Sequence, residues 1–209
     1  MTTSKPRIKR GPAPKSIKRH NYRKKALPSL RRDFKDRCAY SDLHVDDAGG
    51  IDAMDVDHFN PKLKKEVNQR YSNLFLATRH CNGSKGEFWP SEKEKRAGLR
   101  LLNPCRENEF PEHIVEEPET GRLVGKTPAG KLHILVMGLN DPSLVQHRLK
   151  RRHFRDLLRK SDGLIQLKRD ANLADCGEAI RLLKENIDKM IMDIPSNEYR
   201  QEKAQKKGN

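Results

Sequence analysis

A short stretch between residues 55 and 85 carries polar side chains of the kinds that cleave phosphodiesters. Asp55-Val56-Asp57 runs directly into His58, Asn73 follows in Tyr-Ser-Asn-Leu, and Asn82-Gly-Ser-Lys85 completes the set. Phosphodiester hydrolysis needs a base for the attacking water and positive charge near the phosphorus and the leaving oxygen. A divalent ion can supply that charge. The set therefore indicates a site that cleaves phosphodiesters with one metal ion.

Each residue of the set has a role that follows from its functional group. Mg²⁺ prefers oxygen ligands and keeps several waters, so the carboxylate of Asp57 and the amide oxygen of Asn82 would suffice. His58 is the natural general base, because an ordinary imidazole has a pKa of about 6.5. Asn73 cannot transfer protons and is expected to hold backbone and orient the imidazole. Lys85 lies three residues after Asn82, on the same helical face, and is expected to meet a phosphate.

Taken singly, these signals are more often structural, since most Asp-His dipeptides and most turn asparagines have no catalytic role. Their order and spacing carry the information. Adjacent strand residues point to opposite faces, so Asp57 and His58 can serve one site only where the chain bends. The following Phe59-Asn60-Pro61 is a plausible cause of such a bend.

The surrounding pattern predicts a strand, a loop, a second strand and a helix. Imperfect alternation favours a strand over residues 51–57, and an apolar run favours a second over 71–77. A helical turn is expected from about residue 80 toward 86. A β-hairpin packed on one helix can hold ligands from distant sequence positions around a single ion. A separate short helix is expected over residues 29–37.

Beyond Pro90 the pattern favours more helices. Residues 117–125 resemble a hairpin edge, whereas residues 131–138 leave helix and strand both open. Apolar residues at helical spacing predict further helices, at 143–160 and 174–193. The expected fold class is α+β: a small ββα core with flanking α-helices, a helical C-terminal region and a flexible basic N-terminal arm. The expected domains are a disordered arm (1–28), a core (29–125) and a helical region (126–209).

Positive charge is concentrated at the N-terminus. The chain of 209 residues is 34% hydrophobic and 35% charged, with a net charge of +15. Residues 1–32 hold twelve of the 44 Lys and Arg residues and no acidic residue, leaving 32 basic against 29 acidic residues elsewhere. Such an arm suggests nucleic acid, because Lys and Arg release counterions from phosphates; a solvated tail or contact with an acidic protein is the alternative. The candidate nucleic-acid contacts are Lys85, Arg10, Lys18, Arg19, Arg23, Lys24 and Lys25.

The sequence also bears on the compartment. The arm lacks the apolar region of a secretory signal, and no run approaches the roughly 18 apolar residues that span a membrane. A cytoplasmic protein without a membrane partner is therefore expected. The four cysteines form no Cys-x-x-Cys pair, and in a reducing compartment disulfides are not expected.

Together, the motifs resemble those of HNH, or ββα-metal, endonucleases. Asp55-Val56-Asp57-His58 is similar to the first motif of CRISPR-effector HNH domains. Asn73 matches the middle Asn, and Asn82-x-x-Lys85 matches the third motif in its Asn variant. The resemblance implies Asp57 and Asn82 as ligands of Mg²⁺ or Mn²⁺, His58 as the base and Asn73 as the orienting residue.

Longer motifs extend the match over roughly residues 36–160. They are Asp57-His58-Phe59-Asn60-Pro61-Lys62, Tyr71-x-Asn-Leu-x-Leu-Ala77, Cys81-Asn82-x-x-Lys85, Leu102-Asn103-Pro104-Cys105 and Gly138-Leu139-Asn140. Together they resemble the PtuB-like HNH subunit of Septu antiphage systems, whose relatives accompany some retrons. This narrower resemblance implies an effector nuclease acting on nucleic acid, DNA more than RNA, in a defence complex with an SMC-like ATPase subunit. The alternatives are a non-catalytic nucleic-acid-binding or assembly subunit on a degenerate HNH fold, and, from the arm alone, a ribosome-associated protein.

The chain departs from these relatives in its cysteines. They often carry Cys-x-x-Cys where this chain has Cys38-Ala39-Tyr40-Ser41. With Cys81 and Cys105, the missing thiolate would complete a four-Cys structural Zn²⁺ site. Ser41 is a poor substitute, and a histidine (His44, His80 or His113) would have to supply the fourth ligand. The alternative is that Cys38, Cys81 and Cys105 are ordinary buried thiols.

Overall fold

The computed structural model describes residues 8–63, 70–106, 109–170, 181–182 and 185. In these residues the protein is α+β, with helices and two small antiparallel sheets. It divides into two compact units, residues 1–145 and 146–209. The sequence predicts a boundary between residues 125 and 126 instead. The observed boundary lies later in the chain, because α6 (Pro128–Val136) packs on β4 (Leu123–Gly125) and so belongs to the first unit.

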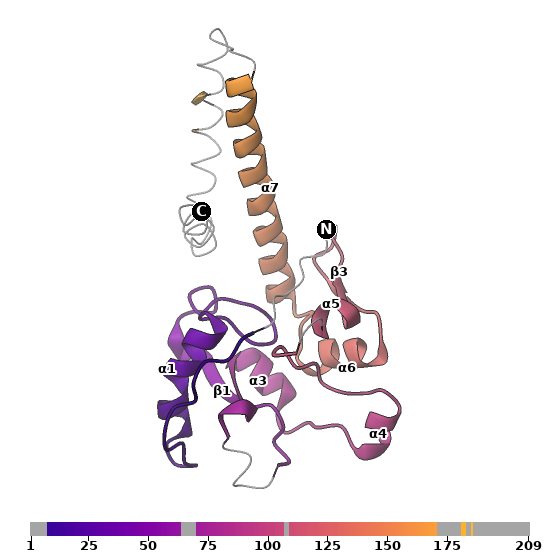
Figure 1. Ribbon diagram of the computed structural model, residues 1–209. Helices are drawn as coiled ribbons and strands as arrows, with labels where there is room; N and C mark the ends of the chain where they lie inside the picture. The colour runs from indigo at the N-terminus through magenta and orange to yellow at the C-terminus, as the bar shows by residue number, and fades with distance from the viewer. Residues whose placement is uncertain (1–7, 64–69, 107–108, 171–180, 183–184, 186–209) are drawn as a thin grey trace. The chain divides into compact units, whose positions relative to one another are not determined.

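A hairpin followed at once by a helix forms the centre of the first unit (Figure 1). Strands β1 (Met54–His58) and β2 (Leu74–Thr78) pair antiparallel, from Met54 opposite Thr78 to His58 opposite Leu74. Helix α3 (Arg79–Lys85) begins directly after β2, where the Thr78 hydroxyl accepts from the Cys81 N–H. The predicted order of strand, loop, strand and helix is confirmed. Both strands begin three residues later than expected, because residues 51–53 and 71–73 form 3₁₀ turns.

Helix α1 (Tyr22–Phe34) packs on the hairpin through one apolar stripe. Ala26, Leu30 and Phe34 recur every fourth residue and are buried, as expected for a core-facing helical face. Pro28 lies on the exposed side. The sequence predicts this helix at residues 29–37 and a disordered arm over residues 1–28. The helix begins earlier than predicted, so residues 22–28 belong to α1 and not to a disordered arm.

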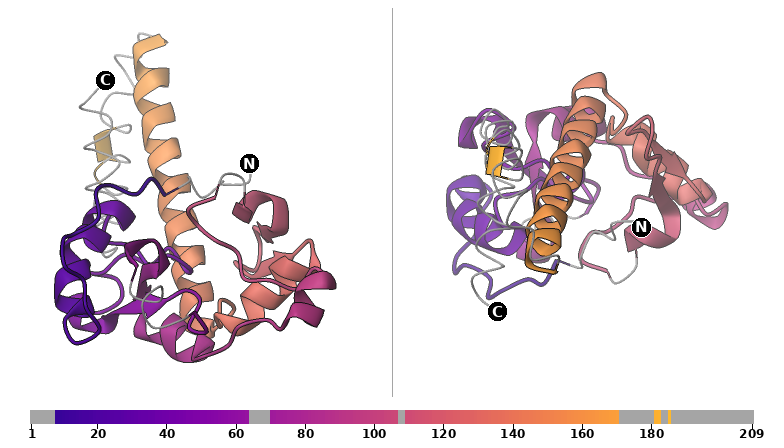
Figure 2. Two further views of the ribbon diagram at one scale, coloured as in Figure 1. Left: turned by 60° about the horizontal axis from the view of Figure 1, so that its bottom comes forward. Right: turned by 90° about the horizontal axis from the view of Figure 1, so that it is seen from above.

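The remaining described elements are mostly short. They are α4 (Glu92–Arg96), α5 (Glu109–His113), β3 (Ile114–Glu116), which pairs antiparallel with β4, and α7 (Pro142–Asp170). Figure 2 shows the elements of the first unit from two other sides. The helix expected at residues 174–193 lies outside the described residues, apart from residues 181, 182 and 185. Within the described ranges, no helix has the length and apolarity to cross a bilayer.

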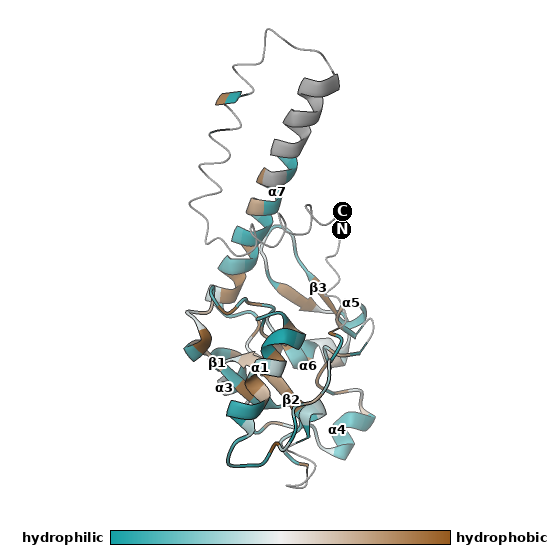
Figure 3. Ribbon diagram, turned by 60° about the vertical axis from the view of Figure 1, so that its left-hand side comes forward, coloured by the Kyte–Doolittle hydropathy of each residue, from teal (hydrophilic) through white to brown (hydrophobic). Residues whose placement is uncertain are grey.

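The hydrophobic core of the first unit lies around β2. All five β2 residues are buried, and Figure 3 shows hydrophobic colour on β3 while α4 is hydrophilic. Phe75 packs between Phe34 of α1 and Phe59 after β1, with ring centroids 5.7 and 4.8 Å away. This core fixes where β1 and α3 present their polar residues.

The motif Gly138-Leu139-Asn140 braces α3 against the second hairpin. The Gly138 carbonyl lies 3.0 Å from Nε2 of His80 on α3. The Asn140 amide accepts from the Leu123 N–H and donates to the Leu123 carbonyl, at 2.8 Å each. Gly138 adopts a φ of +59°, which favours glycine. This motif therefore has a structural role.

Gly138→Ala should destabilise the protein by about 1–3 kcal/mol. The added Cβ would lie 2.8 Å from both His80 Nε2 and Ser84 Oγ, on a backbone that alanine rarely adopts. Urea denaturation measures the loss. Gly83→Ala, in the same region, is the control: a Cβ there meets nothing within 4 Å, so stability should stay or rise slightly. Equal effects of the two changes would contradict the brace.

Candidate functional site

Asp57 lies in a buried cluster with Tyr40 and Lys85. The Lys85 ammonium lies 2.7 Å from Asp57 Oδ1, and the Tyr40 hydroxyl donates to Asp57 Oδ2. The Asp57 and Lys85 side chains are only 4% and 1% exposed. Burial raises the pKa of Tyr40 well above its ordinary value, and the neighbouring Asp57 charge raises it further, so the phenol stays a proton donor. Both carboxylate oxygens of Asp57 are therefore engaged inside the protein.

Lys85 has no donor left for a substrate. Besides Asp57, its ammonium donates to the carbonyls of His58 at 2.8 Å and Gly86 at 3.4 Å, so all three protons have partners. The prediction that Lys85 meets a phosphate is wrong for this structure, because the ammonium is saturated and buried. Lys85 instead ties the end of α3 to the end of β1.

Asp55 and Asn82 make the more accessible contact between the same strand and helix. The Asn82 amide nitrogen donates to Asp55 Oδ2 at 3.1 Å. Arg23 of α1 donates to Asp55 Oδ1 and to the Met54 carbonyl, both at 3.0 Å. The Asp55 side chain is 20% exposed. This carboxylate is thus partly exposed and contacts the predicted ligand Asn82.

Strand and helix geometry explains this pairing. Asp55 and Asp57 share one face of β1, two residues apart, while Asn82 and Lys85 share one face of α3, three residues apart. The helix lies across that face, so each helix residue meets one carboxylate. β1 stays regular through His58, so no bend turns Asp57 and His58 to the same side.

His58 lies beside the first turn of α1. The Tyr22 ring packs against the imidazole with centroids 4.8 Å apart, and the next residue, Arg23, contacts Asp55. The same turn therefore borders both His58 and Asp55. His58 is half-buried and keeps some access to solvent.

Asn73 makes the backbone contacts that the sequence predicts. Its side chain accepts from the Asn60 N–H at 2.9 Å and donates to the Asn60 carbonyl at 3.1 Å. The Asn73 carbonyl also accepts from the Phe59 N–H at 2.9 Å. These bonds fix the chain directly after His58. A contribution of Asn73 to catalysis remains a prediction.

Whether this site could hold a divalent ion depends on the oxygen atoms that Asn82 and Asp57 have available. Mg²⁺ or Mn²⁺ needs oxygen ligands with room for waters. Asn82 fits, because its amide oxygen takes no part in the bond to Asp55 and the side chain is half-buried. Asp57, the second predicted ligand, does not fit as it stands, because Tyr40 and Lys85 occupy it.

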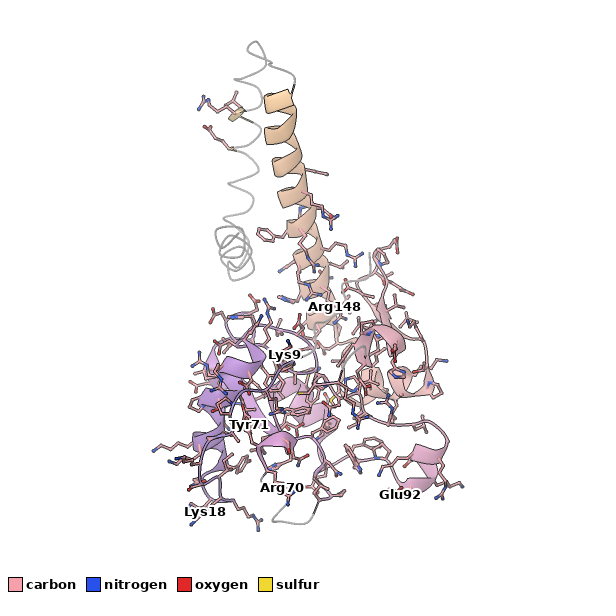
Figure 4. The ribbon with its side chains drawn as sticks, viewed as in Figure 1. Lys9, Lys18, Arg70, Tyr71, Glu92 and Arg148 are labelled. Atoms are coloured by element: carbon pink, nitrogen blue, oxygen red, sulfur yellow. The ribbon has the colours of Figure 1, made fainter. Side chains whose placement is uncertain are left out.

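The predicted nucleic-acid contacts divide into two groups. Arg10 is a structural residue: it donates to the carbonyls of Tyr71 at 3.0 Å and Leu74 at 2.9 Å, and its guanidinium lies over three aromatic rings. These internal contacts were not foreseen from the sequence, and the assignment of Arg10 to nucleic acid remains a prediction. The exposed group borders the start of α1 and comprises Lys18, Arg19, Arg23, Lys24 and Lys25; Figure 4 labels Lys18 near this helix and Tyr71 in the body.

Two of the three predicted zinc cysteines lie together, and zinc binding remains a prediction. Cys38 and Cys81 are buried neighbours, and all three described cysteines are free thiols. Burial raises the pKa of Cys38, but hydrogen bonds from Cys81, Ser41 and the Thr78 N–H outweigh it and lower that pKa. The bond to Cys38 raises the pKa of Cys81. Among the residues described, no three His, Cys, Asp or Glu side chains are grouped to hold a metal.

Comparison with known proteins finds similarity to a Septu protein. The chain is 23% identical over 141 residues to the Septu protein PtuA of Bacillus mycoides (strain KBAB4). The match covers 57% of this chain and 20% of that protein, so the chain spans about a fifth of its relative. The similarity supports a relationship to Septu proteins, although the name is PtuA and not the PtuB expected from the motifs. No family model matches, and no solved structure is significantly similar.

Sequence reasoning missed the residues that surround Asp57 and Asp55. Tyr40 precedes the hairpin by fourteen residues, and no spacing rule links it to Asp57. Arg23 was expected to bind nucleic acid, and its bond to Asp55 was not foreseen. The alternation of side chains along β1 could have indicated Asp55 as a site residue, because it places Asp55 on the same face as Asp57.

Lys85→Met should destabilise the protein by about 3–5 kcal/mol, because it leaves the buried Asp57 carboxylate without its counter-ion. Urea denaturation, with a double-mutant cycle through Asp57→Asn, measures the coupling. Lys62→Met is the matched control, since Lys62 pairs with Glu87 at 3.2 Å on the exposed surface and should matter little. A Lys85 variant as stable as the Lys62 variant would show that the buried bond does not form.

Proposed function

We propose that this protein is a metal-dependent HNH-type endonuclease that hydrolyses phosphodiester bonds of nucleic acid. One observation carries the proposal. In a hairpin followed at once by a helix, the Asn82 amide contacts the Asp55 carboxylate beside the same turn of α1 that packs on His58. The motif resemblance points to the same chemistry.

Each residue near the proposed site has a role that follows from its position. Asn73 holds the backbone after His58 and Tyr22 packs on the ring, so the imidazole proposed as the base is held in place. Asn82 offers an oxygen at the exposed edge of α3. A divalent ion held there would neutralise charge on the phosphate and the leaving oxygen.

The exposed basic residues supply the attraction for a polyanion. Lys18, Arg19, Lys24 and Lys25 lie around the start of α1, the helix that borders His58. Cationic side chains at the rim of a site raise the local concentration of an anionic substrate. Binding of nucleic acid at this rim would therefore present a phosphate to the imidazole.

A role in antiphage defence is the biological setting we propose. The relative found is a Septu protein, and the motifs resemble the nuclease subunit of such systems. We accordingly propose that the protein acts in a complex with an SMC-like ATPase subunit. Co-expression with such a subunit, followed by size-exclusion chromatography, tests for the complex.

His58→Ala should lower Mg²⁺-dependent cleavage by about 10²–10⁴-fold, because the proposed base that takes the proton from water is removed. The assay compares duplex DNA, single-stranded DNA and tRNA, with and without the co-expressed ATPase. His153→Ala, at an exposed position on α7, is the control and should cleave normally. Cleavage unaffected by His58→Ala would disprove the assignment; tight binding without cleavage under any metal would favour a non-catalytic subunit.

Neutralising Lys18, Lys24 and Lys25 together to Gln should weaken nucleic-acid binding. It should also reduce the slope of log K against log salt by about one for each phosphate that the variant no longer touches. Fluorescence anisotropy at several salt concentrations measures both. The matched control neutralises three exposed lysines elsewhere, Lys35, Lys93 and Lys131. Equal slopes for the two triple variants would place the nucleic-acid-binding surface away from α1.

A further inference from the structure

We infer that Asp55, and not Asp57, is the carboxylate that shares the divalent ion with Asn82, and that Asp57 is a positioning residue. The inference rests on the proposed function and departs from the ligand set that the motif resemblance implies. It depends on which of the two carboxylates on the same face of β1 has an oxygen to offer.

Asp57 is committed to holding the fold. Its two oxygens accept from Lys85 and Tyr40, and its side chain is 4% exposed. Coordinating an ion there would require at least one of these donors to leave. That would strand either a buried ammonium or a buried phenol without its partner, which is costly. The cluster is complete without an ion.

Asp55 has the geometry that a shared ion needs. Its Oδ2 lies 3.1 Å from the Asn82 amide nitrogen. A half-turn of that amide, whose nitrogen and oxygen have nearly the same size, would put the amide oxygen at this distance. Two neighbouring oxygens of an octahedral Mg²⁺ site, each about 2.1 Å from the ion, lie about 3 Å apart. The two side chains therefore already have the required separation.

Arg23 fixes the orientation of the Asp55 carboxylate. One guanidinium nitrogen holds Asp55 Oδ1 and the other holds the Met54 carbonyl, both at 3.0 Å. The carboxylate is thus fixed with Oδ2 turned toward Asn82, as outer partners fix a metal ligand. At 20% exposure, the side chain leaves room for waters to complete the coordination.

The test is Mn²⁺ binding to the full chain, measured by the loss of the free-ion signal in electron paramagnetic resonance. Asp55→Asn should weaken Mn²⁺ binding by more than about tenfold while the thermal unfolding midpoint stays close to that of the unchanged protein. Asp52→Asn, an exposed acid on the turn before β1, is the matched control and should bind Mn²⁺ normally.

Asp57→Asn should lower the unfolding midpoint but, where the protein is folded, keep Mn²⁺ affinity within about threefold, since under this assignment Asp57 does not touch the ion. If that variant does not fold, Tyr40→Phe frees Asp57 Oδ2 with almost no change in volume and should likewise leave the affinity unchanged. Normal Mn²⁺ binding by Asp55→Asn, an affinity change in Tyr40→Phe, or no binding by the unchanged protein would each overturn the inference.

Cleavage assays on the same variants separate this inference from the proposed function. Mg²⁺-dependent cleavage that survives Asp55→Asn and is lost in Asp57→Asn overturns the ligand assignment and leaves the nuclease standing. Mn²⁺ binding that depends on Asp55, in a protein that cleaves no nucleic acid, supports the assignment and defeats the nuclease proposal.

Discussion

The buried bond between Lys85 and Asp57 is the constraint on which the candidate site depends. It joins the last residue of α3 to β1 at 2.7 Å. Because α3 also begins directly after β2, the helix is held at both ends against the hairpin. Asn82, between those ends, then has a single position, next to Asp55. A charge pair inside the protein thus determines which residues meet at its surface.

The different roles proposed for the Asp57 and Asp55 carboxylates follow from how exposed each side chain is. The Asp57 carboxylate is enclosed and satisfied by Tyr40 and Lys85, and the Asp55 carboxylate is partly exposed and held by Arg23. Burial makes the enclosed group a fixed support, because its partners cannot leave cheaply. The open group can exchange an amide contact for an ion at little cost. The first turn of α1 packs on His58 through Tyr22 and holds Asp55 through Arg23.

Much of the fold could be predicted from the residue pattern, because local signals determine it. The hairpin, α3 and the long helix after Pro142 each have a clear apolar period or capping residue. The sequence pattern did not predict the start of α1. Pro28 and the surrounding basic residues interrupt the apolar pattern that Ala26 and Leu30 belong to. The partners of Asp57 and Arg10 could not be predicted, because they come from distant segments brought together only by packing.

The similarity to a Septu protein supports the proposed setting in antiphage defence, and the geometry of the hairpin and α3 supports the proposed site. The most direct test is anomalous diffraction from crystals of the protein soaked in Mn²⁺. The account predicts a peak between Asp55 and Asn82, with Asp57 still bonded to Lys85 and Tyr40. A peak on Asp57 with Lys85 displaced, or no peak near α3 at all, would contradict it.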